Sequence, residues 1–240
     1  MGTYVAKLIR REPAAGDTMA FFFERPAGFE FVAGQSMDLT LIDPPQTDAE
    51  GDTRTFSLAS APDEPHLMFA TRMRDTAFKR TLKTLPLGTG ISLEGPSGSM
   101  TLHREAKRPA VMLAGGIGIT PFRSMIFQAV KSAAGPRLYL FYSNRFPEVA
   151  AFLSELQQVA GQHPRFSLIA TMTNMGESRV AWNGATGFID QEMLAKSVDA
   201  LANALYYIAG PPAMVTAMQG ILERAGVGEE DINSEGFSGY

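Results

Sequence analysis

Two patterns of apolar and polar positions divide this chain of 240 residues near residue 104. Before that point, short apolar or alternating runs are separated by glycine and proline, as expected of an antiparallel sandwich or barrel. Met37, Leu39 and Leu41, for example, alternate with polar residues. We expect strands at residues 4–10, 18–24, 35–42, 56–60, 66–71 and 90–94, and one helix over residues 76–85.

After residue 107, continuous apolar runs alternate with helical periodicity. Continuous apolar runs are typical of strands that are buried on both faces of a sheet. Repeated strand, helix and strand predict a parallel sheet with helices on both faces. We expect strands at 109–113, 137–142, 166–170, 205–209 and 232–237, and helices at 121–133, 148–160, 191–197 and 212–225. The sequence thus predicts two domains, an N-terminal antiparallel β-barrel over residues 1–104 and a C-terminal α/β parallel-sheet domain over residues 108–240.

Composition narrows the classes of function. The net charge is −4 without any basic block, which argues against a nucleic-acid partner. The chain has no cysteine, so it holds no disulfide and no Cys-ligated cluster, and its three histidines lie far apart, so we expect no metal site. No apolar run reaches the roughly 20 residues that span a bilayer, and no signal peptide is recognisable at the start. We therefore expect a cytoplasmic protein without a membrane span.

A glycine cluster follows the first strand of the second half and opens a helix. Gly115, Gly116 and Gly118 allow the backbone to approach a ligand closely. Thr120 suits a helix cap, and Pro121 suits a first helical position. The N–H groups at such a helix start bind a pyrophosphate, while a plain tight turn is the alternative interpretation.

Two further segments follow strands of the same predicted sheet, at the edge where open parallel sheets bind ligands. One is a second glycine turn, at Ala209, Gly210 and Pro211. The other follows the second strand and contains Ser143, Asn144 and Arg145, which could bind the 2′-phosphate of a dinucleotide or be a solvated loop. Each segment alone is weak evidence, but two glycine turns at one edge support each other.

Residues 54–60 combine a cation, an aromatic ring and hydroxyls on one strand. Arg54 can pair with a phosphate through its two parallel N–H groups. Phe56 lies on the same face as Arg54, and Thr55 and Ser57 lie on the other. A ring beside a small hydroxyl suits a flat heterocycle, whereas an ordinary strand with an exposed arginine is the alternative.

Together these segments resemble the ferredoxin–NADP reductase-like flavoproteins over essentially the full length of the chain. Residues 54–60 match Arg-x-Tyr-Ser-x-x-Ser, with Phe56 in the place of Tyr, and residues 115–121 match Gly-Gly-x-Gly-x-Thr-Pro at every position. Residues 209–212 correspond to Cys-Gly-Pro-Pro, with Ala209 in the place of Cys. The resemblance implies a flavin-binding barrel, a nucleotide-binding domain and an NAD(P)H-dependent flavoprotein reductase.

The resemblance also implies residue roles. Arg54 would bind a flavin phosphate, Phe56 would lie against the isoalloxazine, and Ser57 would hydrogen-bond the ring near N5. The helix that begins near Thr76 would face the pyrophosphate. Lys79 stands where the family often has Ser, so it either supplies charge or, as is more common for such a lysine, is solvated.

Family members often end near Glu-x-aromatic, which Glu235 and Phe237 match, with Tyr240 as a second aromatic candidate. Ser57 and Glu235 are therefore the catalytic candidates. The cofactor-binding candidates are Arg54, Thr55, Phe56, Ser57, Phe69, Thr71, Thr76, Phe78, Lys79, Gly115, Gly116, Gly118, Thr120, Pro121, Ser143, Asn144, Arg145, Ala209, Gly210, Pro211, Phe237 and Tyr240.

The resemblance favours FAD over FMN, because most members use FAD, and it leaves NADPH and NADH both open as the transient substrate. Because the chain cannot hold a Cys-ligated cluster, electrons would pass to a separate carrier protein or a small acceptor, such as a ferredoxin, a flavodoxin, a partner oxygenase or free flavin. Two alternatives remain: a non-catalytic flavin-binding subunit, against which the intact glycine motif argues, and a flavin-free dehydrogenase, against which residues 54–60 argue.

Overall fold

Two six-stranded sheets organise the residues that the computed structural model describes, 2–103, 108–132 and 135–237. The first sheet is antiparallel and has the order β4-β3-β6-β1-β2-β5. Its strands are β1 (Gly2–Ala15), β2 (Thr18–Glu24), β3 (Ser36–Leu41), β4 (Thr53–Ser57), β5 (His66–Arg72) and β6 (Gly90–Ser97). Just beyond β4, Ala59 N donates to Met68 O at 2.8 Å, so the edge strands meet and close the sheet into a barrel.

Aromatic side chains fill the interior of the barrel. The ring of Phe69 lies 5.8 Å from that of Phe23 and 6.3 Å from that of Phe56. Helix α1 (Ala77–Thr84) closes one end of the barrel, with its Phe78 ring 6.0 Å from Phe56. This packing fixes β4 and the start of α1 against the same core.

The second sheet is parallel and has the order β10-β9-β8-β7-β11-β12. Its strands are β7 (Ala110–Gly115), β8 (Leu138–Asn144), β9 (Phe166–Met172), β10 (Ala185–Thr186), β11 (Leu205–Gly210) and β12 (Ile232–Gly236). The other helices are α2 (Ile119–Ala129), α3 (Leu153–Gln162), α4 (Gln191–Ser197) and α5 (Pro212–Arg224), with single 3-10 turns at Gly116–Gly118, Pro147–Val149, Met175–Glu177, Leu201–Asn203 and Glu229–Asp231.

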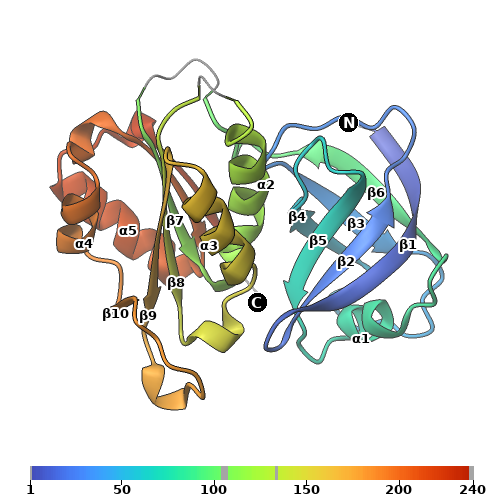
Figure 1. The fold of residues 1–240 in the computed structure, drawn as a ribbon. Helices are drawn as coiled ribbons and strands as arrows, with labels where there is room; N and C mark the ends of the chain where they lie inside the picture. Colours follow the sequence, from blue (N-terminus) through green and yellow to red (C-terminus); the bar gives the residue numbers. More distant parts are fainter. Residues whose placement is uncertain (1, 104–107, 133–134, 238–240) are drawn as a thin grey trace.

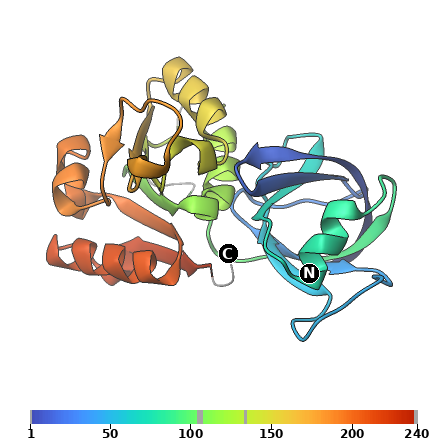
Figure 2. The same ribbon diagram turned by 90° about the horizontal axis from the view of Figure 1, so that it is seen from below.

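Helices cover both faces of the parallel sheet, because successive strand residues point to opposite sides. Met112 and Leu140 pack with α2 and α3 on one face, whereas Val111 and Phe141 pack with α4 and α5 on the other. Helix α2 lies between the parallel sheet and the barrel, as seen from the side in Figure 1 and from below in Figure 2. The face that carries α2 and α3 is therefore the face that meets the barrel.

The predicted fold class is confirmed, and most elements lie within a few residues of their expected bounds. The expected helix at 148–160 is wrong in its first turn, because Pro147–Val149 form a 3-10 turn and α3 begins only after Phe152, whose φ is +62°. Strand β10 was not expected. The domain boundary at residues 104–107 lies outside the described residues and stays a prediction.

Among the described residues, no helix is long and apolar enough to cross a membrane.

Candidate functional site

A cavity of about 280 Å³ opens between the barrel and the α/β half. It is lined on the barrel side by Arg54, Thr55, Phe56, Ser57 and Ala70, and on the other side by Ile117, Thr120, Glu235, Gly236 and Phe237. The fold thus joins the strand of residues 54–57, the glycine turn and the Glu-x-aromatic segment around one space. No group of three or more His, Cys, Asp or Glu side chains in the described part of the chain is placed to hold a metal ion.

Strand β5 presents a different face to the cavity from the one expected. Phe69 and Thr71 are buried on the interior side of the barrel, at 2% and 1% exposure, because alternate residues share a face. Ala70 lines the cavity instead, and the side chain of Arg72 reaches the glycine turn, where a Cβ at Gly116 would lie 3.7 Å from Arg72 Nη2. Sequence reasoning missed both Ala70 and Arg72, because the alternation along β5 does not show which of its faces is interior.

Arg54 is held by carboxylates of the β3–β4 loop. Its Nη2 lies 2.7 Å from Glu50 Oε2 and 3.9 Å from Asp48 Oδ1. Asp48 Oδ2 also accepts a hydrogen bond of 2.7 Å from Ala77 N, the first residue of α1. This bond from Ala77 N, together with one from Glu50 N and the charge of Arg54, holds the pKa of Asp48 below its usual range against a partial desolvation. Two negative side chains therefore bind the cation and the helix N-terminus that are the natural partners of a phosphate.

Lys79 is buried in α1, at 4% exposure, which excludes the solvated alternative and leaves its role as a cofactor-binding residue a prediction. Its Nζ donates to Arg72 O at 2.9 Å, while Thr76 Oγ1 caps the helix by accepting from Lys79 N. Burial, together with the nearby charges of Arg74 and Arg54, lowers the pKa of Lys79 to about 8. Arg54, Arg74 and Lys79 thus lie near the N-terminus of α1, where Asp48 and Glu50 offset part of their charge.

Only one of the three glycines in the turn after β7 has a backbone conformation that favours glycine. Gly116 has φ +54°, in the left-handed region that disfavours side chains. A Cβ at Gly118 would overlap the carbonyl of Ala209, and a Cβ at Gly115 would overlap the sulfur of Met214. Gly115 and Gly118 therefore allow the turn to pack against β11 and α5, rather than making room for a ligand.

The start of α2 differs from the expected one. The helix follows the 3-10 turn without a break, begins at Ile119 and has Gly118 as its N-cap, so Pro121 is its third residue. Thr120 is therefore not the cap, and its Oγ1 donates to Ile117 O at 3.1 Å. Thr120 still lines the cavity.

The end of β8 carries a buried amide. Asn144 is 6% exposed, and its Nδ2 and Oδ1 make no hydrogen bond of ordinary geometry among the described residues, although the hydroxyl of Tyr142 lies close enough to interact with it. Ser143 pairs in register with Gly115, which places Asn144 beside Gly116. Buried amides nearly always have partners, so this amide is suited to bind an ordered water or a ligand. Arg145 is exposed, with its guanidinium carbon 5.5 Å from the centre of the Phe146 ring.

Strand β12 brings the chain back to the cavity. Glu235 pairs with Ala209 in register, and Phe237 N donates to Gly210 O at 2.9 Å. Burial raises the pKa of Glu235. Ala209, Gly210 and Pro211 do not line the cavity themselves; they support the residues that do. Tyr240 lies outside the described residues.

Comparison with known proteins adds independent information. Residues 112–220 match the family model of the oxidoreductase NAD-binding domain. The chain is 31% identical over 191 residues to ferredoxin–NADP reductase B of Sorangium cellulosum, which covers 78% of this chain and 75% of that protein. It is 27% identical over 223 residues to the glycine betaine monooxygenase reductase subunit of Chromohalobacter salexigens, covering 92% of this chain but only 60% of that longer protein. The structure of a ferredoxin–NADP⁺ reductase from Neisseria gonorrhoeae with bound FAD and NADP has the same fold, with a TM-score of 0.82, 21% identity and coverage of 98% of both chains.

Proposed function

We propose that this chain, which belongs to the ferredoxin–NADP reductase-like family of NAD(P)H-dependent flavoprotein reductases, binds FAD in the cavity between its halves. It would transfer hydride between NAD(P)H and the flavin, and pass electrons to a separate acceptor. One observation carries the proposal: a single cavity is lined by Ser57 from the barrel and by Ile117 and Thr120 from the glycine turn. Two ring systems that exchange a hydride need such a shared space, because reacting atoms must approach to about 3–3.5 Å.

The groups around Arg54 fit the phosphates of FAD. Arg54 and Ala77 N already hold two carboxylates, and Lys79 lies buried beside them. The two phosphates of FAD carry one negative charge each, so together they could replace both carboxylates. The family resemblance favours FAD over FMN. When bound, FAD supplies the ring that accepts or donates hydride.

Residues on the cavity wall would orient the ring and exclude water. Phe56 contributes a wall that is fixed from behind by Phe69 and Phe78, and Phe237 contributes apolar surface from the opposite side. The Ser57 hydroxyl would hydrogen-bond the ring. Glu235, whose pKa is raised by burial, would hold a proton at its carboxyl group more readily than an exposed glutamate would.

The dinucleotide would lie across the end of the parallel sheet. The N-terminus of α2 and the Arg72 side chain both face the region of Gly116, where a pyrophosphate is stabilised by N–H groups and positive charge. Asn144 would supply the hydrogen bonds that it lacks within the described chain. We include both NADPH and NADH as substrates, with the exposed Arg145 as the candidate partner of a 2′-phosphate.

The acceptor would be a separate electron carrier or an oxygenase component. Two relatives support this choice, one named as a ferredoxin–NADP reductase and the other as the reductase subunit of a monooxygenase. Because the chain contains no cysteine, an iron–sulfur carrier with Cys ligands must be a different protein or a different segment.

The test is an anaerobic visible spectrum of the FAD-loaded protein before and after NADPH or NADH is added. We expect flavin bands that bleach, with the ratio of the two rates giving the nicotinamide preference. Bands that persist with both nucleotides would contradict the proposed activity and favour a non-catalytic flavin-binding subunit. A protein that cannot be loaded with FAD at all would contradict the flavin assignment itself.

A further inference from the structure

One buried arginine joins the two halves of the molecule. Arg123 of α2 is 6% exposed, and its Nη1 donates to Ala59 O at 2.8 Å, just beyond the cavity-lining end of β4. Nη1 and Nη2 also donate to the two carboxylate oxygens of Glu64, at 2.8 and 3.2 Å. On its other side, Nε and Nη2 donate to the carboxylate of Glu155 in α3, at 2.6 and 3.2 Å. Arg123 therefore has one carboxylate partner in each half.

Two further side chains, one in α2 and one just after it, also contact residues 59–64 of the barrel. The hydroxyl of Ser124, which is fully buried, donates to Ser60 O at 2.6 Å. Near the end of α2, Lys131 forms an ion pair with Asp63. Helix α2 is thus attached along its length to residues 59–64, which continue directly from the strand that carries Arg54 and Ser57.

An apolar seam completes this junction. Ile117 of the glycine turn packs with Ala59 and Ala70 of the barrel. Phe152 packs against the same seam, with its ring centre 5.5 Å from the guanidinium carbon of Arg123. Its φ of +62° is unusual for a residue with a side chain and is tolerated only where surrounding packing demands it. The junction thus combines charge, hydrogen bonds and a strained residue at one place.

We propose that Arg123 and Glu64 act as a positioning pair that sets the distance between the bound flavin and the bound nicotinamide. The first turn of α2 carries Thr120, and the segment held by Arg123 continues the strand that carries Ser57, so the pair links the two sides of the cavity within a few residues of each. This inference rests on the proposed function. A buried ion pair contributes little net stability, but its fixed fork geometry specifies orientation.

The chain supplies a matched control in Glu155. Glu64 and Glu155 both bind the same guanidinium through two oxygens, and their side chains are similarly exposed, at 28% and 33%. They differ in location, because Glu64 belongs to the barrel and Glu155 to the same half as Arg123. Glu64 Oε2 also accepts a hydrogen bond of 2.5 Å from Ala61 N, which the amide oxygen of Gln can still accept. Glu64→Gln and Glu155→Gln should therefore lower the free energy of unfolding to a similar extent, but only Glu64→Gln should loosen the junction.

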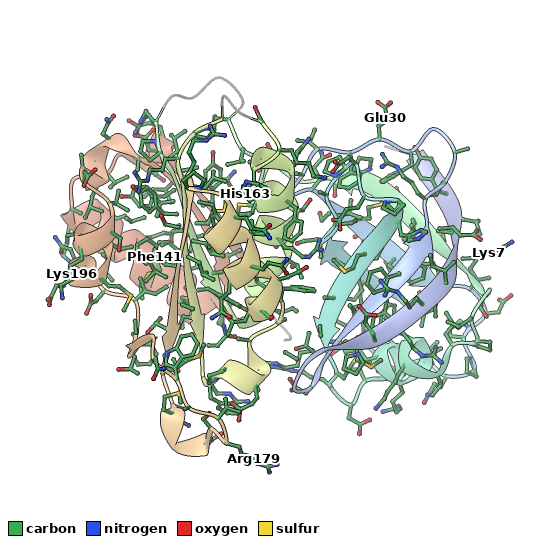
Figure 3. All side chains as sticks on the ribbon, in the orientation of Figure 1. Lys7, Glu30, Phe141, His163, Arg179 and Lys196 are labelled. Atoms are coloured by element: carbon green, nitrogen blue, oxygen red, sulfur yellow. The ribbon has the colours of Figure 1, made fainter. Side chains whose placement is uncertain are left out.

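The first readout needs no cofactor. Because the chain contains no cysteine, Lys7→Cys and Lys196→Cys place one spin label on each half, at exposed positions on opposite sides of the molecule (Figure 3). In the flavin-free protein, pulsed EPR should give a broader label-to-label distance distribution for Glu64→Gln than for the parent. Glu155→Gln should leave the distribution unchanged. Equal broadening in both variants, or in neither, would overturn the proposal.

The second readout is single-turnover reduction of bound FAD by saturating NADPH or NADH. Glu64→Gln should lower the limiting rate about tenfold or more, since misplacement by an ångström costs up to about a hundredfold. The half-saturating nucleotide concentration should change little, and Glu155→Gln should stay within about twofold of the parent in both values. Equal slowing of both variants would overturn the proposal. A parent protein whose flavin is not reduced would contradict the proposed function instead, and the EPR result would still decide the role of Glu64.

Discussion

On the barrel side of the cavity, the groups suited to a phosphate are bound by the chain itself. Glu50 and Asp48 hold Arg54, and Asp48 holds Ala77 N. On the α/β side, the buried amide of Asn144 makes no hydrogen bond of ordinary geometry among the described residues and lies beside the Tyr142 hydroxyl. Under the proposed function, flavin binding would therefore be an exchange of anions, whereas dinucleotide binding would add hydrogen bonds to an amide that is poorly paired within the chain.

The two sides of the cavity should also differ in how substitutions change the free energy of unfolding. On the barrel side, internal carboxylates offset the positive charge of Arg54, so FAD would have to compete with them. On the other side, a ligand that hydrogen-bonds Asn144 would displace no internal anion. Variants on the two sides should therefore differ in how they change stability as well as in which ligand they affect.

The largest expected effect belongs to Arg54→Ala. Loss of a charge-assisted phosphate contact, worth about 1.5–3 kcal/mol, should weaken FAD binding by roughly tenfold to a hundredfold. Fluorescence titration of the flavin-free protein measures this, and dinucleotide affinity should not change. Arg10→Ala, on an exposed arginine paired with Glu12, is the control. Unchanged FAD affinity in Arg54→Ala would remove this residue from the flavin site.

Gly116→Val should weaken dinucleotide binding without changing flavin binding. The left-handed φ of +54° opposes a branched side chain at this position. Strain of about 1–3 kcal/mol at this turn should weaken dinucleotide binding by about tenfold or more. The visible spectrum of bound flavin should be unaltered. Normal flavin reduction at low dinucleotide concentration would contradict the proposed dinucleotide site.

Asn144→Ala separates a ligand-binding role from a structural one. Dinucleotide affinity should fall by about threefold to tenfold, the value of one neutral hydrogen bond. Because the amide makes no hydrogen bond of ordinary geometry in the described chain and only lies beside the Tyr142 hydroxyl, its removal should change the free energy of unfolding little. Chemical denaturation checks stability, and titration with NADP⁺ and NAD⁺ checks affinity. A large loss of stability would show that the amide has a structural partner.

The smallest expected effect is a pH dependence of the free energy of unfolding that comes from Lys79. Its pKa is lowered to about 8 by burial and by Arg74 and Arg54, with Glu50 acting in the opposite direction. Between pH 8 and about 10.4 the unfolded chain binds more protons at this residue than the folded chain. The free energy of unfolding should therefore rise with pH in this window, by on the order of 1–2 kcal/mol after solvent screening.

The check is denaturation of the flavin-free protein across that pH range beside Lys79→Met. The variant should lack the part of the rise that comes from Lys79. Identical pH profiles for the two proteins would show that the lysine keeps an ordinary pKa in the folded state.

The sequence was sufficient to predict elements whose bounds depend only on the pattern of neighbouring residues. Strand β2 and helix α4 have the expected bounds, because alternation and helical periodicity are properties of adjacent residues. Residues 54–57 and the glycine turn were chosen as candidates because one combines a cation, an aromatic ring and hydroxyls and the other clusters glycines at the start of a helix. Their meeting at one cavity followed from the family resemblance rather than from the pattern.

The predictions failed where packing between distant segments determines which face of a strand is buried, where a helix begins or which residues meet. Phe69 and Thr71 were named as cofactor-binding candidates, but both are buried and Ala70 between them lines the cavity, and only the closed barrel shows which face of β5 is interior. The late start of α3 depends on Phe152, whose conformation is imposed by the seam between the halves. Asp48, a loop residue, and Arg123, a helix residue, act on partners far away in sequence, so no local periodicity could identify them.

The most direct test of the account is a side-by-side FAD titration of the flavin-free parent and the double variant Asp48→Asn, Glu50→Gln. If flavin phosphates replace these carboxylates, the double variant should bind FAD more tightly, by severalfold and up to about tenfold for exposed ion pairs. Its NADP⁺ affinity should stay unchanged. Equal or weaker FAD binding in the double variant would contradict the exchange and place the flavin phosphates elsewhere.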